Sequence, residues 1–315
     1  MCEAKLFFEG SEKKIEVIFD KSLPSLRTFP KSYWEDLVAS SQAQILSEIQ
    51  NDSMTAYLLS ESSLFVYNHY LVMITCGTTK LISAVDKLME KFKQDDIAAF
   101  FYERKNELLP REQATDFFTD VEKLKTWFKG TAMRYGREDE HHLFLFASEK
   151  TYTPSDDDHT MEVLMHGIAP EVMAKFTNCK GCDHQKLRDE SGISDIVQGQ
   201  VDDFVFEPMG YSLNAIDNNN YFTIHITPES QGSYISFETN AFSADMQVEW
   251  ASKVIQVFKP MSFDLVLFNK SKVQKPDFKN FTMKRQFAEK LKTGYETQYF
   301  SYYQPNETEQ KPQVF

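Results

Sequence analysis

Short segments in which apolar and polar residues alternate recur along the whole chain, and they limit the possible folds more than any other feature. The most regular ones lie at residues 14–19, 143–146, 221–227, 233–239 and 263–268. Successive side chains of a strand point to opposite faces of its sheet, so a period of two predicts strands with one apolar and one polar face. Sheets are therefore expected to dominate the fold.

A helical pattern is clearest just after residue 80. Its apolar stripe, with Lys and Asp on the opposite face, consists of Leu81, Ile82, Val85, Leu88, Met89 and Phe92. We expect Thr78 or Thr79 to cap the N-terminus of this helix. Further helices are expected at residues 32–41, 114–128, 170–176 and 244–258.

The order of these segments suggests an internal duplication. In the first half, strands within 57–76 lead into a helix, and in the second half, strands within 211–239 lead into the helix at 244–258. Strands grouped into hairpins and followed by helices indicate an α+β fold with antiparallel sheets. Because no glycine-rich linker divides the halves, we expect one domain over residues 1–301. The Gln/Pro/Glu-rich segment 302–315 is expected to be a flexible C-terminal tail.

The composition excludes several classes of partner. A net charge of −13 argues against nucleic acid and anionic membrane surfaces, because both require a basic surface. No apolar stretch approaches the ~20 residues of a membrane-spanning helix. The N-terminal residues do not resemble a signal peptide, and the 4 cysteines are too few for a secreted disulfide framework. We expect a cytoplasmic protein with reduced thiols.

A short loop contains Cys179 and Cys182 and is followed by His184, which looks like half of a zinc site. A structural zinc ion needs four ligands, usually from two such pairs, and the sequence has no second pair. A loop with two free thiols is the expected interpretation, and no metal is expected.

Candidate catalytic residues lie at the ends of strands. Glu61 and Ser62 occur in Leu-Ser-Glu-Ser-Ser, which alone is most often a serine-rich turn. Cys76 ends an apolar strand, where a cysteine is usually a small buried hydrophobe, although a thiol just before a helix can also be tuned for reactivity. His225 shares a polar strand face with Thr223; such a histidine is commonly an ordinary polar residue, but its titration range suits a general base.

Five blocks in this order resemble the eukaryotic S-adenosylmethionine decarboxylases. The blocks are Phe-Phe-Glu-Gly-Ser-Glu at 7–12, Leu-Ser-Glu-Ser-Ser at 59–63, Thr-Cys-Gly-Thr-Thr at 75–79, Gly-Tyr-Ser at 210–212 and His-Ile-Thr-Pro-Glu at 225–229. The resemblance implies a four-layer αββα sandwich of two antiparallel sheets. It also implies decarboxylation of S-adenosylmethionine to the aminopropyl donor of spermidine and spermine biosynthesis.

The resemblance implies that the proenzyme cleaves itself between Glu61 and Ser62, giving chains 1–61 and 62–315. Ser62 becomes a pyruvoyl cofactor, which forms a Schiff base with the substrate. A serine is required because its hydroxyl oxygen first attacks the peptide and later leaves. The remaining roles follow the family pattern: Ser212 and His225 act in processing, Cys76 is the proton donor, and Glu9 and Glu12 shape the site.

Four residues are implied to bind the substrate. Phe8 and Phe206 would otherwise be ordinary core aromatics; in the resembled family such a pair sandwiches the adenine and faces the sulfonium, because rings stack on a purine and attract a cation. Glu229 would accept hydrogen bonds from the ribose hydroxyls, although a Pro-Glu pair after a strand also fits a solvated turn. Leu59 completes the implied set.

An acidic site for putrescine, which activates some members of the family, is also implied. Its candidate residues are Glu16, Asp158, Thr160, Glu162, Glu238, Phe101, Arg104 and Phe268. Relatives that respond to putrescine often carry Lys two residues before the catalytic cysteine, where this chain has Ile74. Either the diamine or Arg104 is therefore expected to balance the acidic residues, with a slight preference for a putrescine response.

Two other interpretations stay open at this point. A regulatory paralogue could activate a partner decarboxylase without being active itself, but such a protein would be expected to lack Ser62 or Cys76. An unrelated α+β binding protein could carry the motifs by accident. If the resemblance holds, two cleaved αβ units are expected to form a homodimer.

Overall fold

Two eight-stranded antiparallel sheets form the protein, as a computed structural model of residues 8–177, 179, 181–229 and 232–305 shows. The first sheet contains, in spatial order, β2 (Ile45–Gln50), β3 (Met54–Leu59), β4 (Ser62–Tyr67), β5 (Tyr70–Thr75), β1 (Lys13–Phe19), β6 (Ile97–Lys105), β8 (His142–Ser148) and β7 (Gly130–Gly136). The second sheet contains β10 (Gln200–Val205), β11 (Tyr211–Asp217), β12 (Asn220–Thr227), β13 (Tyr234–Thr239), β9 (Thr160–Ile168), β14 (Pro260–Asn269), β16 (Glu296–Tyr303) and β15 (Thr282–Lys290).

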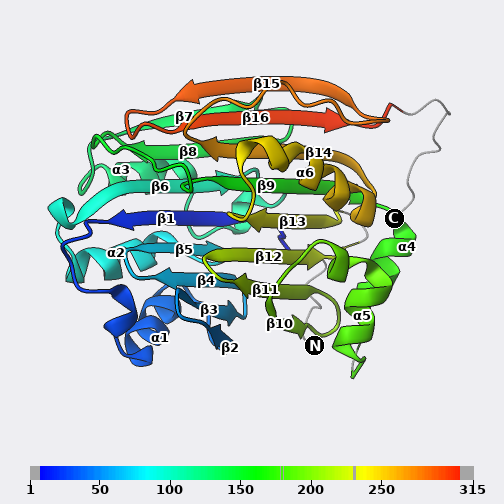
Figure 1. Cartoon of the computed structure of the whole chain (residues 1–315), viewed down its shortest axis with the longest axis horizontal. Helices are drawn as coiled ribbons and strands as arrows, with labels where there is room; N and C mark the ends of the chain where they lie inside the picture. Colours follow the sequence, from blue (N-terminus) through cyan, green and yellow to red (C-terminus); the bar gives the residue numbers. More distant parts are fainter. Residues whose placement is uncertain (1–7, 178, 180, 230–231, 306–315) are drawn as a thin grey trace.

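The two sheets have the same topology. Adding eight to each strand number of the first sheet gives the strand order of the second, and Figure 1 shows the two sheets lying over one another. This correspondence supports the internal duplication that the sequence suggests.

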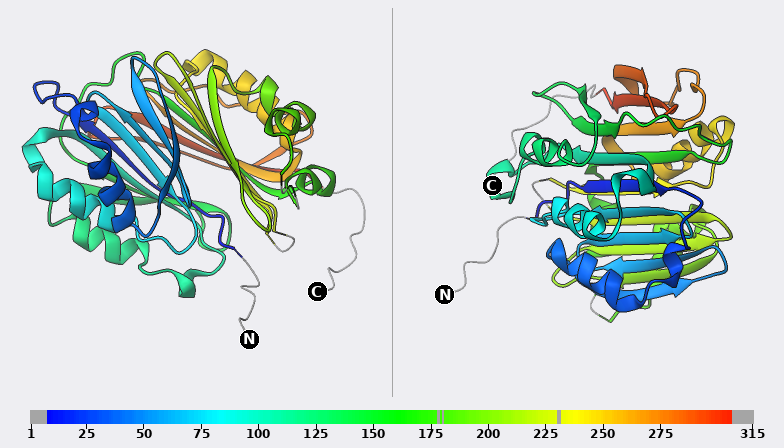
Figure 2. Two further views of the ribbon diagram at one scale, coloured as in Figure 1. Left: turned by 90° about the horizontal axis from the view of Figure 1, so that it is seen from below. Right: turned by 90° about the vertical axis from the view of Figure 1, so that its left-hand side faces the viewer.

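Helices cover the outer face of each sheet, which gives four layers (Figure 2, left). The α-helices are α1 (Lys31–Ser40), α2 (Ile82–Lys91) and α3 (Phe117–Leu124) on the first sheet, and α4 (Pro170–Met173), α5 (His184–Ser191) and α6 (Ala244–Phe258) on the second. Short 3-10 helices lie at Leu26–Thr28, Gln94–Asp96, Pro110–Glu112, Ala174–Phe176 and Ile193–Asp195. The expected α+β fold, an αββα sandwich, is confirmed.

The helix boundaries differ in detail from those expected. Helix α3 begins later than residue 114, because the Asp116 side chain accepts a hydrogen bond from the Thr119 N–H and so caps it. The expected threonine cap of α2 is wrong: Leu81 occupies the cap position and makes no side-chain cap hydrogen bond. The Thr79 hydroxyl instead donates to the Cys76 carbonyl at 2.7 Å, which fixes the turn that follows β5.

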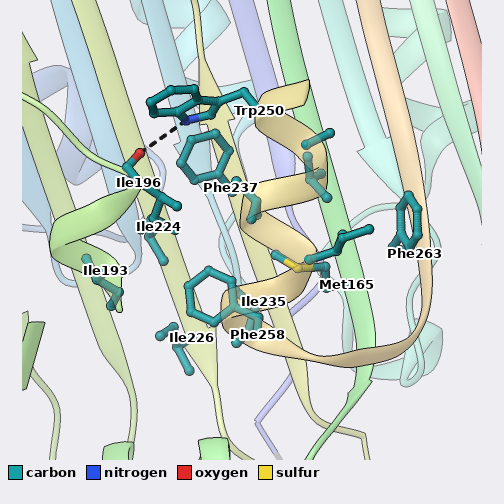
Figure 3. Packing of buried hydrophobic residues seen from close by; sticks show 14 of the residues in the cluster. Met165, Ile193, Ile196, Ile224, Ile226, Ile235, Phe237, Trp250, Phe258 and Phe263 are labelled. Atoms are coloured by element: carbon teal, nitrogen blue, oxygen red, sulfur yellow. Dashed lines mark hydrogen bonds between the residues drawn. The ribbon is translucent and has the colours of Figure 1, made fainter. Parts of the chain in front are cut away.

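The apolar cores lie mainly between each sheet and its helices. Trp250 and Phe258 of α6 pack in one apolar core with Ile224 and Ile226 of β12 (Figure 3). The Trp250 indole N–H donates to the Ile196 carbonyl at 3.4 Å. The alternation expected for residues 221–227 is confirmed, since the isoleucines face the helix and His225 lies on the opposite face. The layer between the sheets receives polar side chains such as His225, together with two smaller apolar clusters.

Strand β16 continues through Tyr302 to Tyr303, and Tyr302 is only 2% exposed. Its hydroxyl donates to the Pro276 carbonyl at 2.7 Å. The tail expected from residue 302 therefore begins with two residues of a strand, and 306–315 lie outside the described residues. No helix in the described part of the chain is long and apolar enough to cross a membrane.

Candidate active site

A cavity of about 380 Å³ brings together residues from both sheets. Of the residues expected in a catalytic or substrate-binding role, those that line it are Phe8, Glu61, Ser62, Cys76, Phe206, Ser212, His225 and Glu229. They come from five separate stretches of the chain, and the duplicated fold gathers them where the ends of β4, β5, β11 and β12 meet.

The Glu61–Ser62 bond lies at the tight turn between β3 and β4. Leu59 pairs with Ser62 across this hairpin, so only Ser60 and Glu61 form its loop. Ser62 has φ 129°, a region that favours glycine, and this strain costs about 1–3 kcal/mol. Its hydroxyl is buried and has no hydrogen-bond partner among the described residues. A strained serine with an uncommitted hydroxyl is thus held at the bond expected to be cleaved.

The carbonyl of Glu61 is held by Cys76. The Cys76 backbone N–H donates to this oxygen at 2.9 Å, and the Cys76 Sγ lies 3.5 Å from it. Hydrogen-bond donors fixed on a carbonyl stabilise the negative charge that develops when a nucleophile attacks it. Gly77 permits this approach: its φ is +63°, and a Cβ there would lie 2.9 Å from Glu61 Oε2 and 3.2 Å from Phe8 Cζ.

The thiol of Cys76 is kept in its protonated form. Burial and, to a smaller extent, the negative charges of Glu61 and Glu12 raise the pKa of this thiol well above its ordinary value. The nearby Lys13, whose Nζ donates to the Gly77 carbonyl at 2.9 Å, opposes this shift. Burial lowers the pKa of Lys13 itself to about 8. A protonated thiol in the cavity is suited to donate a proton.

The imidazole of His225 is neutral near pH 7. Burial, which outweighs the opposing charge of Glu12, lowers its pKa to about 4. Nδ1 lies 2.9 Å from the Ser212 hydroxyl, while Nε2 lies 2.9 Å from the Thr223 hydroxyl and 3.2 Å from the Ser63 hydroxyl. A neutral ring is the form in which histidine can act as a base.

Ser63 and Asn214 belong to the hydrogen-bond network around His225, and the sequence analysis missed both. The Asn214 amide N–H donates to the Tyr57 carbonyl at 3.1 Å, so its Oδ1 faces Ser63 and accepts the Ser63 hydroxyl proton at 2.6 Å. The Ser63 oxygen then accepts a hydrogen bond either from Nε2–H at 3.2 Å or from the Thr223 hydroxyl at 3.1 Å. The first arrangement makes Nδ1, beside Ser212, the basic atom of the ring. Alternation could have revealed Asn214, since it lies two residues from Ser212 on β11 and therefore on the same face.

Glu12 and Glu9 lie behind the cavity and do not line it. Glu12 accepts hydrogen bonds from Lys105, Tyr234 and Ser236. Although burial alone would raise its pKa, Lys105, His225 and Ser236 hold the pKa of Glu12 below the ordinary value.

Glu9 holds the backbone near the cavity. Its carboxylate accepts from the N–H groups of Ser11 and Leu109, at 3.3 and 2.7 Å. Its carbonyl accepts from the Gly77 N–H at 2.9 Å. These contacts position the Cys76–Gly77 turn.

The residues expected to bind the substrate divide into two groups. Phe8, Phe206 and Glu229 line the cavity, and the Glu229 carboxylate accepts from the Phe8 N–H at 3.0 Å, which fixes the position of Phe8. The side chain of Leu59 is instead fully buried in the apolar core beneath the helices of the first sheet. A substrate contact through this side chain is not supported by its position.

A buried acidic cluster between the sheets has a lysine at its centre. The Nζ of Lys14 lies 2.7 Å from Glu162, 3.2 Å from Glu238 and 3.5 Å from both Glu16 and Glu103. All five side chains are at most 4% exposed. The sequence analysis missed Lys14, although it lies two residues from Glu16 on the same strand and thus on the same face.

Lys105 extends this cluster toward the cavity, since its Nζ lies 2.9 Å from Glu12 and 3.0 Å from Glu162. Burial and the charge of Glu162 raise the pKa of Glu103 to about 8 and that of Glu238 to about 7. Glu162 differs: burial opposes ionisation, but Lys105 and Lys14 lower its pKa to about 2. The positive charges of the lysines and the protonation of some carboxyl groups together compensate the negative charge of the cluster.

The role expected for Arg104 is wrong. Its side chain points to the helix side of the sheet, where it lies 2.6 Å from Glu107 and 2.7 Å from Asp120. Arg104 alternates along β6 with Glu103 and Lys105, which face the acidic cluster. Consecutive residues of a strand point to opposite faces, so Arg104 cannot balance that cluster.

The other candidate residues surround the cluster. Asp158, which accepts from the Tyr152 hydroxyl at 2.6 Å, lines a second cavity of about 350 Å³ together with Glu16 and Thr160. Phe101 and Phe268 pack edge to face with ring centroids 5.7 Å apart. Lys14 Nζ lies 5.6 Å from the centroid of the Phe268 ring.

Comparison with known families identifies this arrangement. A family model described as adenosylmethionine decarboxylase matches residues 5–310. The chain belongs to this family. Relatives named S-adenosylmethionine decarboxylase proenzyme include one from Xenopus laevis, which is 39% identical over 83% of this chain and 83% of its own length. Another, from Dictyostelium discoideum, is 37% identical over 83% of this chain and 74% of its own length.

A solved structure from the same family shares the fold. It is described as the crystal structure of Trypanosoma brucei AdoMetDC-delta26 monomer, and it aligns with a TM-score of 0.59 over 77% of this chain and 99% of that chain, at 23% identity. Both family membership and fold thus agree with the resemblance found in the sequence.

Proposed function

We propose that this chain is a self-processing S-adenosylmethionine decarboxylase, cleaved between Glu61 and Ser62. The observation that carries the proposal is the strained Ser62, whose unpartnered hydroxyl adjoins the Glu61 carbonyl held by Cys76 N–H. Substrate, product and a role in polyamine synthesis follow from membership of the family.

Processing begins when the Ser62 hydroxyl attacks the carbonyl of Glu61. The developing oxyanion is stabilised by the Cys76 N–H, and the peptide rearranges to an ester, which also relieves the backbone strain at Ser62. Neutral His225 then takes up the α-proton of Ser62, the ester carboxylate of Glu61 leaves, and a dehydroalanine remains. Addition of water to its imine tautomer releases ammonia and leaves a pyruvoyl group at residue 62.

The residues present fit such a group. When formed, it supplies a ketone that binds the substrate amine and draws electrons from the breaking carboxylate bond. Phe8 and Phe206 offer ring faces to a purine or a sulfonium, and Glu229 offers a carboxylate to ribose hydroxyls. The protonated Cys76 thiol is the group in the cavity suited to return a proton to the α-carbon.

We further propose that Lys14 takes the place that a diamine would occupy in the acidic cluster. Its ammonium group already contacts four carboxyl groups, and Lys105 contacts two. The sequence analysis expected a putrescine response because Arg104 alone could not neutralise four acidic residues. Lys14 and Lys105 supply two cations that it did not consider, so this reason for a putrescine response no longer holds. Pairing of two cleaved units stays a prediction.

The mass of the purified protein on a denaturing gel tests the proposal. The wild-type chain should separate into fragments 1–61 and 62–315, and the larger fragment should carry an N-terminal pyruvoyl group. Cleaved protein should release carbon dioxide from carboxyl-labelled S-adenosylmethionine. An intact chain with no activity would instead favour a non-catalytic paralogue.

A further inference from the structure

We propose that His141, His166 and Asp264 form a binding site for a divalent transition-metal ion that joins the two sheets. One ligand atom from each of these side chains lies within 4.8 Å of the other two. Two imidazoles and one carboxylate are a ligand set that Zn²⁺ and its first-row neighbours accept, with water in an open position.

The fold brings the three residues together from three elements. On β9 and β14, Ser262 pairs with His166 and Asp264 pairs with Leu164, so His166 and Asp264 are diagonal neighbours on one face of the second sheet. Leu164 belongs to the apolar cluster between the sheets, so this face is the inner one. His141 reaches the pair from the first sheet, since it lies immediately before β8.

The state of Asp264 is an independent indication of a missing cation. Its side chain is 2% exposed, and its Oδ1 is buried with no hydrogen-bond partner among the described residues. The imidazole of His141 faces it from the first sheet, and its Nδ1 lies 3.9 Å from Oδ2, beyond hydrogen-bond distance. A buried carboxylate oxygen without a close partner is costly, and a metal ion would remove that cost.

The two histidines are prepared to act as ligands. Their ring centroids lie 3.7 Å apart, and the backbone carbonyl of His141 accepts from the Tyr299 hydroxyl at 3.0 Å, which anchors this segment. Metal bonds of ~2.0–2.2 Å require the donor atoms to approach one another by only about 1–2 Å.

Access and location suggest what the ion does. His141 and Ser262 line a cavity of about 710 Å³, which offers a path for the ion and space for a water ligand. The ring of His166 lies 5.2 Å from that of Tyr234, whose hydroxyl donates to Glu12 at 3.2 Å. Because Tyr234 separates this site from the processing residues, the ion fastens the sheets together and does not take part in the reaction.

Titration of the metal-free full-length protein with Co²⁺ and Zn²⁺ tests this inference. One equivalent of Co²⁺ should bind and give visible d–d bands without thiolate charge-transfer bands, and Zn²⁺ should raise Tm. His141→Ala and Asp264→Asn should each weaken binding by more than about 10-fold, because changes to outer-shell residues alone cost 10–100-fold. His141 lies in a partly exposed loop, so its variant should fold.

His142→Ala is the matched control, since this neighbouring side chain bonds instead to the Glu140 carbonyl at 2.9 Å. It should bind Co²⁺ as the wild type does. Absence of stoichiometric binding, or equal affinity in the control and both ligand variants, would overturn the inference. Thiolate bands that disappear in Cys179→Ser would also overturn it, because they would place the metal at the cysteine loop.

Discussion

Replacing Lys14 by methionine should convert the protein into one that depends on an added diamine. Methionine keeps an unbranched side chain of similar length but removes the ammonium group. That group is 1% exposed and lies within 3.5 Å of four glutamates. Removal of one partner from a buried ion pair typically costs about 3–5 kcal/mol. With about 2–4 °C lost per kcal/mol, Tm should fall by roughly 6 °C or more.

Putrescine should restore part of this loss in Lys14→Met. A dication that binds the vacated position at 100 times its Kd would return about 2.7 kcal/mol. Activity and the rate of self-cleavage should rise in parallel with Tm. The wild type should show none of these responses, because Lys14 already fills the position. The assay compares Tm, cleavage and carbon dioxide release with and without putrescine, on protein dialysed free of diamines.

Lys31→Met is a suitable control, because Lys31 pairs with Glu48 at 2.8 Å on the surface, where an ion pair contributes little. It should lower Tm slightly and leave the protein indifferent to putrescine. Two outcomes would refute the reasoning about Lys14. One is activation of the wild type by putrescine, and the other is a Lys14→Met variant that is as stable as the wild type.

Four further predictions concern the cavity. Ser62→Ala should remain a single uncleaved chain on a denaturing gel, and normal cleavage would refute the processing scheme. Cys76→Ala keeps the N–H that holds the Glu61 carbonyl, so it should be cleaved but release carbon dioxide about 10²–10⁴ times more slowly, as expected for loss of one positioned acid. Ser63→Ala should slow cleavage roughly tenfold, the effect of about one hydrogen bond, because the imidazole of His225 loses one of its hydroxyl partners. An unchanged cleavage rate would leave Ser63 a packing residue. Because burial lowers the pKa of His225 to about 4, its ring stays neutral from pH 8 to 5.5. The cleavage rate of freshly refolded protein should therefore be constant over this range and fall only as the pH approaches 4. A pH profile with its midpoint near 6.5 would contradict the argument that burial lowers this pKa.

The sequence predicted the fold well where alternation was regular. Residues 221–227 show an apolar and a polar face, and the structure places the isoleucines under α6 and His225 between the sheets. The boundaries of α6 at Ala244 and Phe258 also agree with the expected helix. The capping of α2 was not predictable from composition, because the hydroxyl of Thr79 is used by the turn at Cys76 instead.

The site was predictable to the extent that its motifs are local. Short recognisable blocks contain Ser62, Cys76 and His225. The strained backbone of Ser62 and the hydrogen bond from the Cys76 N–H to the Glu61 carbonyl instead depend on how two hairpin ends meet. Such contacts join residues far apart in the sequence. A single sequence contains no direct signal of them.

The error over Arg104 shows which sequence signal was underused. Charged residues at i and i+2 on a buried strand must face the same layer, so strand alternation alone assigns Lys14 with Glu16 on β1, and Glu103 with Lys105 on β6, to one face each. The same rule directs Arg104 to the opposite face, where Asp120 neutralises it. Since β1 and β6 are adjacent and pair Lys14 with Glu103, the two strands together carry both the charges and their compensation. A cluster that contains its own cations on neighbouring strands does not require a diamine for folding, and for this reason the response of Lys14→Met to putrescine is the most informative test of how the chain is activated.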